Sequence, residues 1–112
     1  MSSSQSYSDY ISDQLSDLEG VSWRAMMGEF ILYYKGRIVG GIYDDRLLVK
    51  PTAAALSLLP SAKRERPYEG AKEMLLVDRI DDRAFLTELL NAMLDELPAP
   101  QEKRARRQRR SP

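Results

Sequence analysis

The 112-residue sequence contains neither cysteine nor histidine. The absence of cysteine excludes disulfides, thiol nucleophiles and thiolate metal ligands. The absence of histidine removes the usual general base of enzymes and the commonest side-chain metal ligand. Nucleophilic catalysis would need a serine with a lysine, or a carboxylate, and no lysine is compellingly placed beside Ser57 or Ser61. These absences favour a protein that is not an enzyme and that holds no cofactor or metal.

Long apolar runs are also missing from the sequence. No run of about 18 apolar residues is present, so we expect no membrane span. The opening segment, MSSSQSYSDY, contains neither the basic patch nor the apolar core of a signal peptide. We therefore expect a cytoplasmic protein. The length predicts a single domain over residues 1–100, followed by a tail over residues 101–112.

The formal charge is balanced overall, with 17 basic and 17 acidic residues, but the two signs are unevenly distributed. Against one acid, Glu102, the tail has six basic residues: Lys103, Arg104, Arg106, Arg107, Arg109 and Arg110. The remainder of the chain is acidic by the same margin. We predict that the tail is disordered. Such a split indicates an anionic partner. The basic residues either contact the phosphates of a nucleic acid or form a solvated tail.

Three segments have helical patterns. The first begins after Ser6 as N-cap and ends at Gly20, and its apolar positions recur at helical spacing: Tyr7, Tyr10, Ile11, Leu15 and Leu18. A short helix is predicted between Pro51 and Pro60. The last helix begins after Asp81 or Asp82 and has a broad apolar stripe: Phe85, Leu86, Leu89, Leu90, Met93, Leu94 and Leu97.

The segment from Val21 to Lys50 predicts four consecutive strands. Gly28, the pair Lys35-Gly36 and the pair Asp44-Asp45 are the turn signals between them. A loop follows over residues 61–70, and Lys72 to Asp78 reads as a fifth strand. The order predicts an α+β fold. Its antiparallel meander of about five strands carries the first and last helices on one face and the short helix between strands four and five.

Two details of the meander carry further expectations. Alternation places Trp23, Ala25 and Met27 on one face of the first strand. Gly40-Gly41 lies inside the third strand, where glycine indicates a bulge or the close approach of another element. We favour a helix packed over this position, and a ligand site lined by backbone is the alternative.

Several side chains are candidates for a binding surface. Polar and apolar positions on the strands form a possible ligand or partner surface: Arg24, Met26, Glu29, Tyr34 and Lys50. The alternative is that they form the solvent side of a sheet. Tyr33, Tyr34, Tyr43 and Tyr68 either stack on bases or pack across strands. Three acids could collect a hard cation, although helix capping explains them equally well: Asp78, Asp81 and Asp82.

The hairpin region resembles the signature of the TfoX N-terminal domain family, also called Sxy, which contains bacterial regulators of natural competence. The resemblance extends from the first helix to about Leu97. It is carried by a methionine–glycine step, a tyrosine-bearing strand, a glycine turn, a second apolar strand and an Asp-x-Leu-x-x-Lys segment: Met26 to Gly28, Phe30 to Tyr34, Gly36, Ile38 to Ile42, and Asp45 to Lys50. Because the family's two-domain members continue into a helical domain where this chain has its basic tail, we expect a stand-alone form.

This resemblance implies an α+β domain with no catalytic residues and a role in transcription regulation. The leading hypothesis is a non-enzymatic interaction module whose partner is a transcription regulator or a component of RNA polymerase. Direct nucleic-acid binding through the basic tail and a small-ligand-binding domain are the alternatives. A symmetric homodimer through a sheet edge or the last helix is a further possibility.

Overall fold

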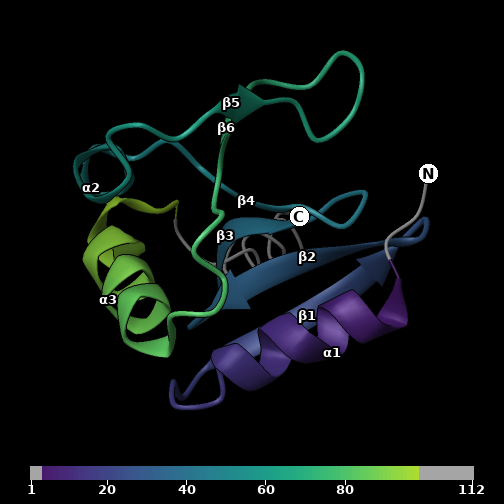
Figure 1. Ribbon diagram of the computed structural model, residues 1–112, viewed down its shortest axis with the longest axis horizontal. Coiled ribbons are helices and arrows are strands. Elements are labelled where there is room, and N and C mark those ends of the chain that lie inside the picture. The colour runs from purple at the N-terminus through teal and green to yellow at the C-terminus, as the bar shows by residue number, and fades with distance from the viewer. Residues whose placement is uncertain (1–3, 99–112) are drawn as a thin grey trace, which may run out of the picture.

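A six-stranded antiparallel sheet forms the centre of the molecule, as the computed structural model of residues 4–98 shows (Figure 1). Its strands lie in the order β1-β2-β3-β4-β6-β5. Their bounds are β1 Val21–Met26, β2 Glu29–Tyr34, β3 Arg37–Ile42, β4 Leu47–Val49, β5 Arg64–Glu65 and β6 Met74–Leu76. The helices are α1 Gln5–Gln14, α2 Ala53–Leu58 and α3 Arg83–Met93, and the 3-10 turn η1 spans Leu94–Glu96. The predicted α+β meander is confirmed.

One strand was not predicted from the sequence. The prediction of about five strands placed residues 61–70 in a loop, whereas Arg64–Glu65 forms β5 and pairs with β6. The two residues have no apolar alternation, so the segment carries no strand pattern. It becomes a strand because β6 offers an open edge, and the side chain of Arg46 fixes it through an ion pair of 2.5 Å with Glu65.

Three two-residue turns connect the first four strands, and all of them place both residues at positive φ. The turns are Met27-Gly28, Lys35-Gly36 and Asp44-Asp45. This geometry matches the right-handed twist of the flanking strands. The expectation that Met27 lies on a strand face with Trp23 is wrong, because Met27 occupies the first turn at φ 54° and is 96% exposed.

The glycine pair in β3 is required by its neighbouring strands and not by a helix. A Cβ atom on Gly40 would lie 2.0 Å from the carbonyl oxygen of Leu48 in β4. A Cβ atom on Gly41 would lie 2.5 Å from the carbonyl oxygen of Phe30 in β2. The pairing of β2 with β3 also shifts register between Leu32 and Tyr33, which marks a bulge. The predicted bulge and close approach are therefore confirmed, but the favoured helix is not the approaching element.

Side-chain caps begin each helix. Ser4, and not the predicted Ser6, accepts the N–H of Tyr7 at the start of α1. Thr52 accepts the N–H of Ala55 at the start of α2, one residue after Pro51. Asp82, one of the two predicted caps, accepts the N–H of Phe85 at 3.0 Å. Each cap satisfies a backbone donor that the first helical turn leaves unpaired.

The core lies between one face of the sheet and the helices. Ile11 of α1, its C-cap residue Leu15 and the apolar stripe of α3 join strand residues in one buried cluster. The strand residues of this cluster include Leu32, Val49 and Leu75. Arg37 then ties the end of the domain to β3, because its guanidinium donates to the carbonyl oxygens of Leu94 and Leu97. The prediction that the first and last helices cover one face of the sheet is confirmed.

Two further expectations concern a membrane span and the C-terminal tail. No helix within residues 4–98 is long and apolar enough to cross a membrane. The predicted tail of residues 101–112, with all six of its basic side chains, lies outside the described residues.

Candidate functional site

The face of the sheet opposite the helices carries a groove of about 410 Å³. It lies where β3 and the end of β4 meet the segment between β5 and β6. Its lining comes from these three regions: Ile38, Gly40, Tyr43, Lys50, Pro51, Pro67, Tyr68, Ala71, Lys72, Glu73 and Met74. The volume is within the range of about 300–1,000 Å³ that is typical of binding pockets. We call this site the Tyr43–Tyr68 groove.

Two tyrosines form the aromatic side of the groove. Tyr43 follows β3, and Tyr68 lies in the loop after β5, with ring centroids 6.4 Å apart and planes tilted by 60°. This tilted geometry is a favourable one for aromatic pairs. Burial, followed by the nearby Tyr68, Glu29 and Tyr33, raises the pKa of Tyr43 above its usual 10.0. Tyr43 is therefore a neutral hydroxyl at neutral pH, and Tyr68 remains 65% exposed.

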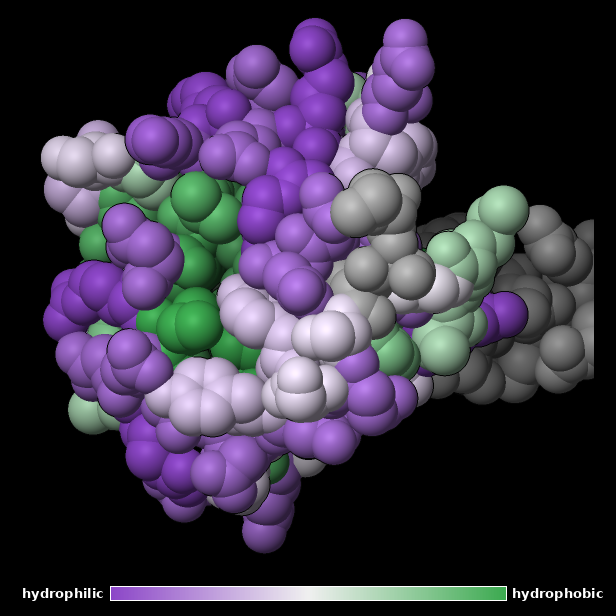
Figure 2. All heavy atoms as spheres, turned by 45° about the vertical axis from the view of Figure 1, so that its right-hand side comes forward, coloured by the Kyte–Doolittle hydropathy of each residue, from purple (hydrophilic) through white to green (hydrophobic). Residues whose placement is uncertain are grey.

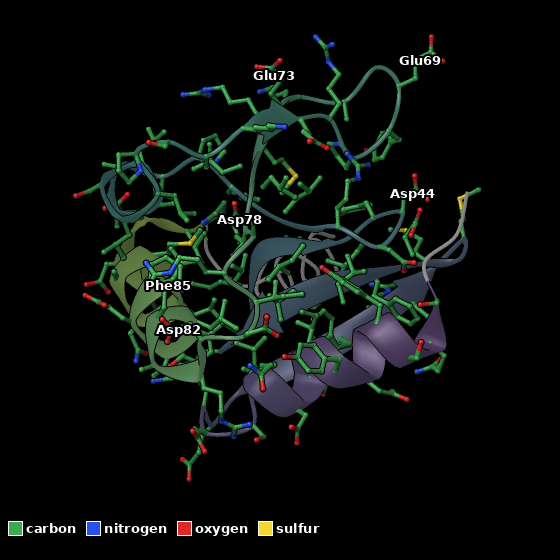
Figure 3. The ribbon with its side chains drawn as sticks, in the orientation of Figure 1. Asp44, Glu69, Glu73, Asp78, Asp82 and Phe85 are labelled. Carbon is green, nitrogen blue, oxygen red and sulfur yellow. The ribbon has the colours of Figure 1, made fainter. Side chains whose placement is uncertain are left out.

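Lys50 supplies the charge of the groove. It follows β4 directly, and burial lowers the pKa of its ammonium below the usual 10.5. Within residues 4–98 no ion pair involves Lys50, in contrast to Arg46, Arg79 and Arg83. Lys72 adds a second, exposed cation to the lining, while Glu73 points away from the body of the molecule (Figure 3). A partly desolvated cation without a carboxylate partner is a favourable contact for an anion.

The structure disperses the surface residues predicted from the sequence. Of that set only Lys50 lines the groove. Arg24 and Met26 lie on β1, which β2 and β3 separate from β4. Glu29 begins β2 and accepts the N–H of Asp44 at 3.2 Å.

The assignment of Tyr34 to the same surface is wrong. Its side chain points to the helix face, is 2% exposed and belongs to the core cluster. Its hydroxyl donates to Oδ1 of Asn91 on α3 at 2.5 Å. The parity of β2 explains this outcome, because Leu32 and Tyr34 share the covered face while Ile31 and Tyr33 share the other.

Two of the three acids considered for a cation make other contacts. Asp82 caps α3 and pairs with Arg79 at 2.8 Å, and Asp81 accepts the hydroxyl of Tyr10. Figure 3 shows Asp78 and Asp82 at separate positions on the way into α3. No group of three metal-ligating side chains occurs within the part of the chain that the structure describes. The capping interpretation therefore holds for Asp82.

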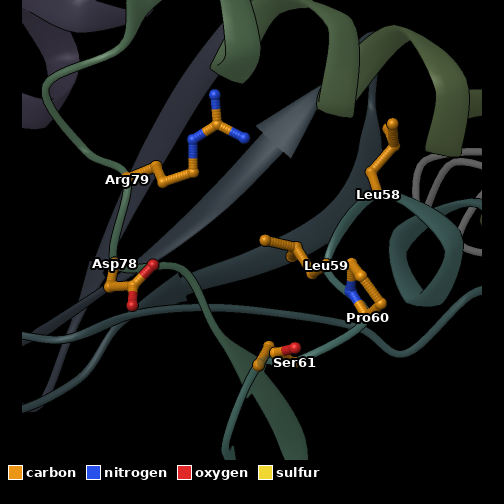
Figure 4. A pocket seen from close by; sticks show the side chains of 7 residues that line it. Leu58, Leu59, Pro60, Ser61, Asp78 and Arg79 are labelled. Carbon is orange, nitrogen blue, oxygen red and sulfur yellow. The ribbon is translucent and has the colours of Figure 1, made fainter.

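A second hollow, of about 230 Å³, lies at the end of α2 (Figure 4). It is lined by Leu58, Leu59, Pro60, Ser61, Ala62, Asp78 and Arg79. Arg79, its only basic side chain, already pairs with Asp82 and lies 4.0 Å from the ring centre of Phe85. Because its cation is already paired, this hollow is a weaker candidate than the Tyr43–Tyr68 groove.

The sequence predicted parts of the groove but not their assembly. Tyr43, Tyr68 and Lys50 were each candidates for stacking or contact, whereas Ile38, Lys72 and Met74 were not. The signal that could have found Lys72 and Met74 is the pairing of β4 with β6, which brings their segment beside Lys50. On the face drawn in Figure 2, hydrophobic side chains gather in one area that hydrophilic side chains border.

The sheet, the helices on one of its faces and the groove on the other define a small α+β domain. The chain is 32% identical over 107 residues to the "Uncharacterized 12.7 kDa protein in trpE 5'region" of Spirochaeta aurantia, across 95% of this chain and 93% of that protein. The chain belongs to the same family as this spirochaete protein. No family model matches the chain, and no solved structure matches it.

Proposed function

We propose that this chain is a non-enzymatic interaction module that holds a short acidic segment of a protein partner in the Tyr43–Tyr68 groove. The observation that carries the proposal is the position of Lys50, whose partly buried side chain shares the groove lining with two tyrosines and has no ion pair within residues 4–98. A carboxylate placed there would complete a charge pair that the folded domain leaves open.

The lining indicates what kind of segment would bind. Lys50 and Lys72 favour an aspartate or glutamate, and Ile38, Met74 and the tyrosine rings favour a neighbouring apolar side chain. Tyr68 is 65% exposed, so the groove does not enclose its occupant as a small-molecule pocket does. This openness supports a protein segment over a small ligand.

The sequence resemblance to the TfoX N-terminal domain supports a class of partner. It favours a transcription regulator or a component of RNA polymerase, with the chain acting as a coregulator in the cytoplasm. A role in natural competence belongs to the same proposal. The groove chemistry fits such partners because acidic segments with apolar side chains suit a lysine–tyrosine surface.

Affinity capture from native lysate tests this function with three full-length variants. We expect the wild-type chain to retain a transcription protein, and we expect Lys50→Glu and Tyr68→Ala to lose it by about tenfold or more, since like charges and lost aromatic contact weaken binding. Lys63→Glu is the matched control, because Lys63 is an exposed lysine outside the groove lining. Equal retention by Lys50→Glu and the wild type would contradict the groove as the contact site.

Direct nucleic-acid binding is a second candidate, which the six basic residues of segment 101–112 favour. If about five phosphates are neutralised, the logarithm of the affinity should fall against the logarithm of the salt concentration with a slope near −4. Gel shifts with the full chain and with a chain ending at Pro100 test this candidate. Equal binding by both would remove the tail from consideration.

A further inference from the structure

The two edges of the sheet differ in a way that bears on assembly. The outer edge of β5 is two residues long and is flanked by Lys63, Arg66 and Pro67. Short length, charge and proline are the devices that keep sheet edges from pairing with other chains. The opposite edge, β1, is six residues long, contains no proline and carries one charge, Arg24. Only the β1 edge is therefore built to accept another strand.

The hydrogen-bond phase of β1 fixes which residues face outward. Lys35 donates to the carbonyl oxygen of Gly20 at 2.8 Å, one position beyond the register that pairs Val21 with Tyr34. Alternate residues of an antiparallel strand bond to the same neighbour, so Ser22, Arg24 and Met26 bond to β2. The N–H and C=O groups of Val21, Trp23 and Ala25 consequently point to the free edge.

We infer that β1 forms a symmetric dimer by pairing antiparallel with β1 of a second copy, about a two-fold axis at Trp23. This register places Trp23 opposite Trp23 of the partner, and Val21 opposite the partner's Ala25. The free N–H and C=O groups of Val21, Trp23 and Ala25 then face the same groups of the partner. This pairing allows about six new hydrogen bonds. An interface of this kind is isologous, as a closed dimer requires.

The charges on β1 select this register over its neighbour. In the Trp23-centred register, Arg24 lies directly opposite the partner's Ser22, and the two copies of Arg24 are only diagonal neighbours about 8 Å apart. If the two-fold axis moved by one residue to Arg24, the two copies of Arg24 would lie directly opposite each other, and two like charges in this position are unfavourable. The helix faces of the two copies lie on the same side of the joined sheet. Trp23, whose buried indole N–H lacks a hydrogen-bond partner within the described residues, lies at the centre of the interface.

Sedimentation velocity of the full chain tests the dimer, and we expect twice the 12.8 kDa chain mass at micromolar concentration. Ala25→Pro removes an outward N–H without touching the β2 ladder, so we expect a folded monomer with a cooperative urea transition. Arg24→Pro, one residue away, removes a bond to β2, and we expect it to lose that cooperative transition. A wild-type chain that sediments as a monomer at all concentrations would overturn the inference.

The absence of cysteine from the chain allows a second test of the register. In the Trp23-centred dimer, Ser22 lies opposite the partner's Arg24, whereas the two copies of Ser22 lie diagonally about 8 Å apart. Mixed Ser22→Cys and Arg24→Cys chains should therefore form a disulfide dimer in at least about tenfold greater yield than either chain alone. A dimer that survives Ala25→Pro, or equal cross-linking by the single and mixed chains, would place the interface elsewhere and overturn the inference.

Discussion

The two faces of the sheet are made from the same strands but have opposite environments. On the helix face, Leu32 in β2 and Leu89 in α3 are fully buried in one cluster. On the other face, Tyr33 and Ile38 are partly buried, and neither belongs to the core cluster that the helices cover. Leu48 is the exception there, since it is buried without belonging to the main cluster. The covered face thus stabilises the fold, while the open face is available for contact.

The largest expected effect separates the two faces directly. Leu89→Ala should lower the free energy of unfolding by about 2–5 kcal/mol, because it leaves a cavity in the closed core. Ile38→Ala, the matched truncation on the open face, should cost about 1 kcal/mol or less. Urea denaturation of both variants measures the difference. Equal losses would mean that the two faces contribute alike to stability.

Gly40→Ala probes the sheet that both faces share. A Cβ atom there would meet the Leu48 carbonyl at 2.0 Å, and backbone cannot move aside as a flexible side chain does. We expect a loss of about 1–3 kcal/mol or more in the free energy of unfolding. Gly70→Ala is the control for space, because nothing lies within 4 Å of its Cβ position, although its φ of +88° adds strain of its own. A neutral Gly40→Ala would show that β3 and β4 can separate.

Met27→Asn should stabilise the protein by about 1 kcal/mol, because methionine is a poor residue at φ 54° and asparagine followed by glycine is favoured in this turn. Met27 is 96% exposed, so no packing is lost. Thermal denaturation measures the gain. A loss of stability would show that Met27 makes a contact beyond the exposed turn that the structure describes.

The stability that Asp82 contributes at the start of α3 should fall at acidic pH. The N–H of Phe85, followed by the Arg79 guanidinium, holds the pKa of Asp82 below its usual 3.8. A carboxyl whose pKa is depressed by folding contributes stability above its unfolded value, and that stability is lost as the pH falls through the folded pKa. Asp82→Asn should therefore flatten the decline of stability below about pH 4. Chemical denaturation between pH 2 and pH 6, as approximate limits, compares the two chains. An unchanged decline would place the acid sensitivity in other carboxyls.

The contribution of Lys50 on the open face to folding stability should rise at alkaline pH. Burial lowers the pKa of Lys50, so the charged ammonium disfavours the folded state until it loses its proton. Stability contributed through this group therefore rises as the pH increases from the folded pKa toward 10.5. Lys50→Met should be slightly more stable than wild type at neutral pH and should lack this rise. Identical pH profiles for both chains would remove the desolvation argument for the groove.

Turn chemistry and helix stripes made most of the fold predictable from the sequence. Lys35-Gly36 and Asp44-Asp45 signal tight turns through local backbone preferences, and the stripe from Phe85 to Met93 signals a buried helix face. Both are short-range properties. Tyr34 was misassigned because its face depends on strand parity, which a single residue type does not reveal. The groove was not predictable as a unit, because Lys50 and Met74 meet only through the pairing of β4 with β6.

The three tight turns have a consequence for how the chain folds. Strands β1 to β4 pair with sequence neighbours, so their ladders close only short loops. Hairpins of this kind form in about 1–10 μs, whereas β6 must first return across the connection that contains α2 and β5. We therefore expect the early meander to act as a template, with β6 and α3 joining later. A nascent chain would have this template complete before its last helix is synthesised.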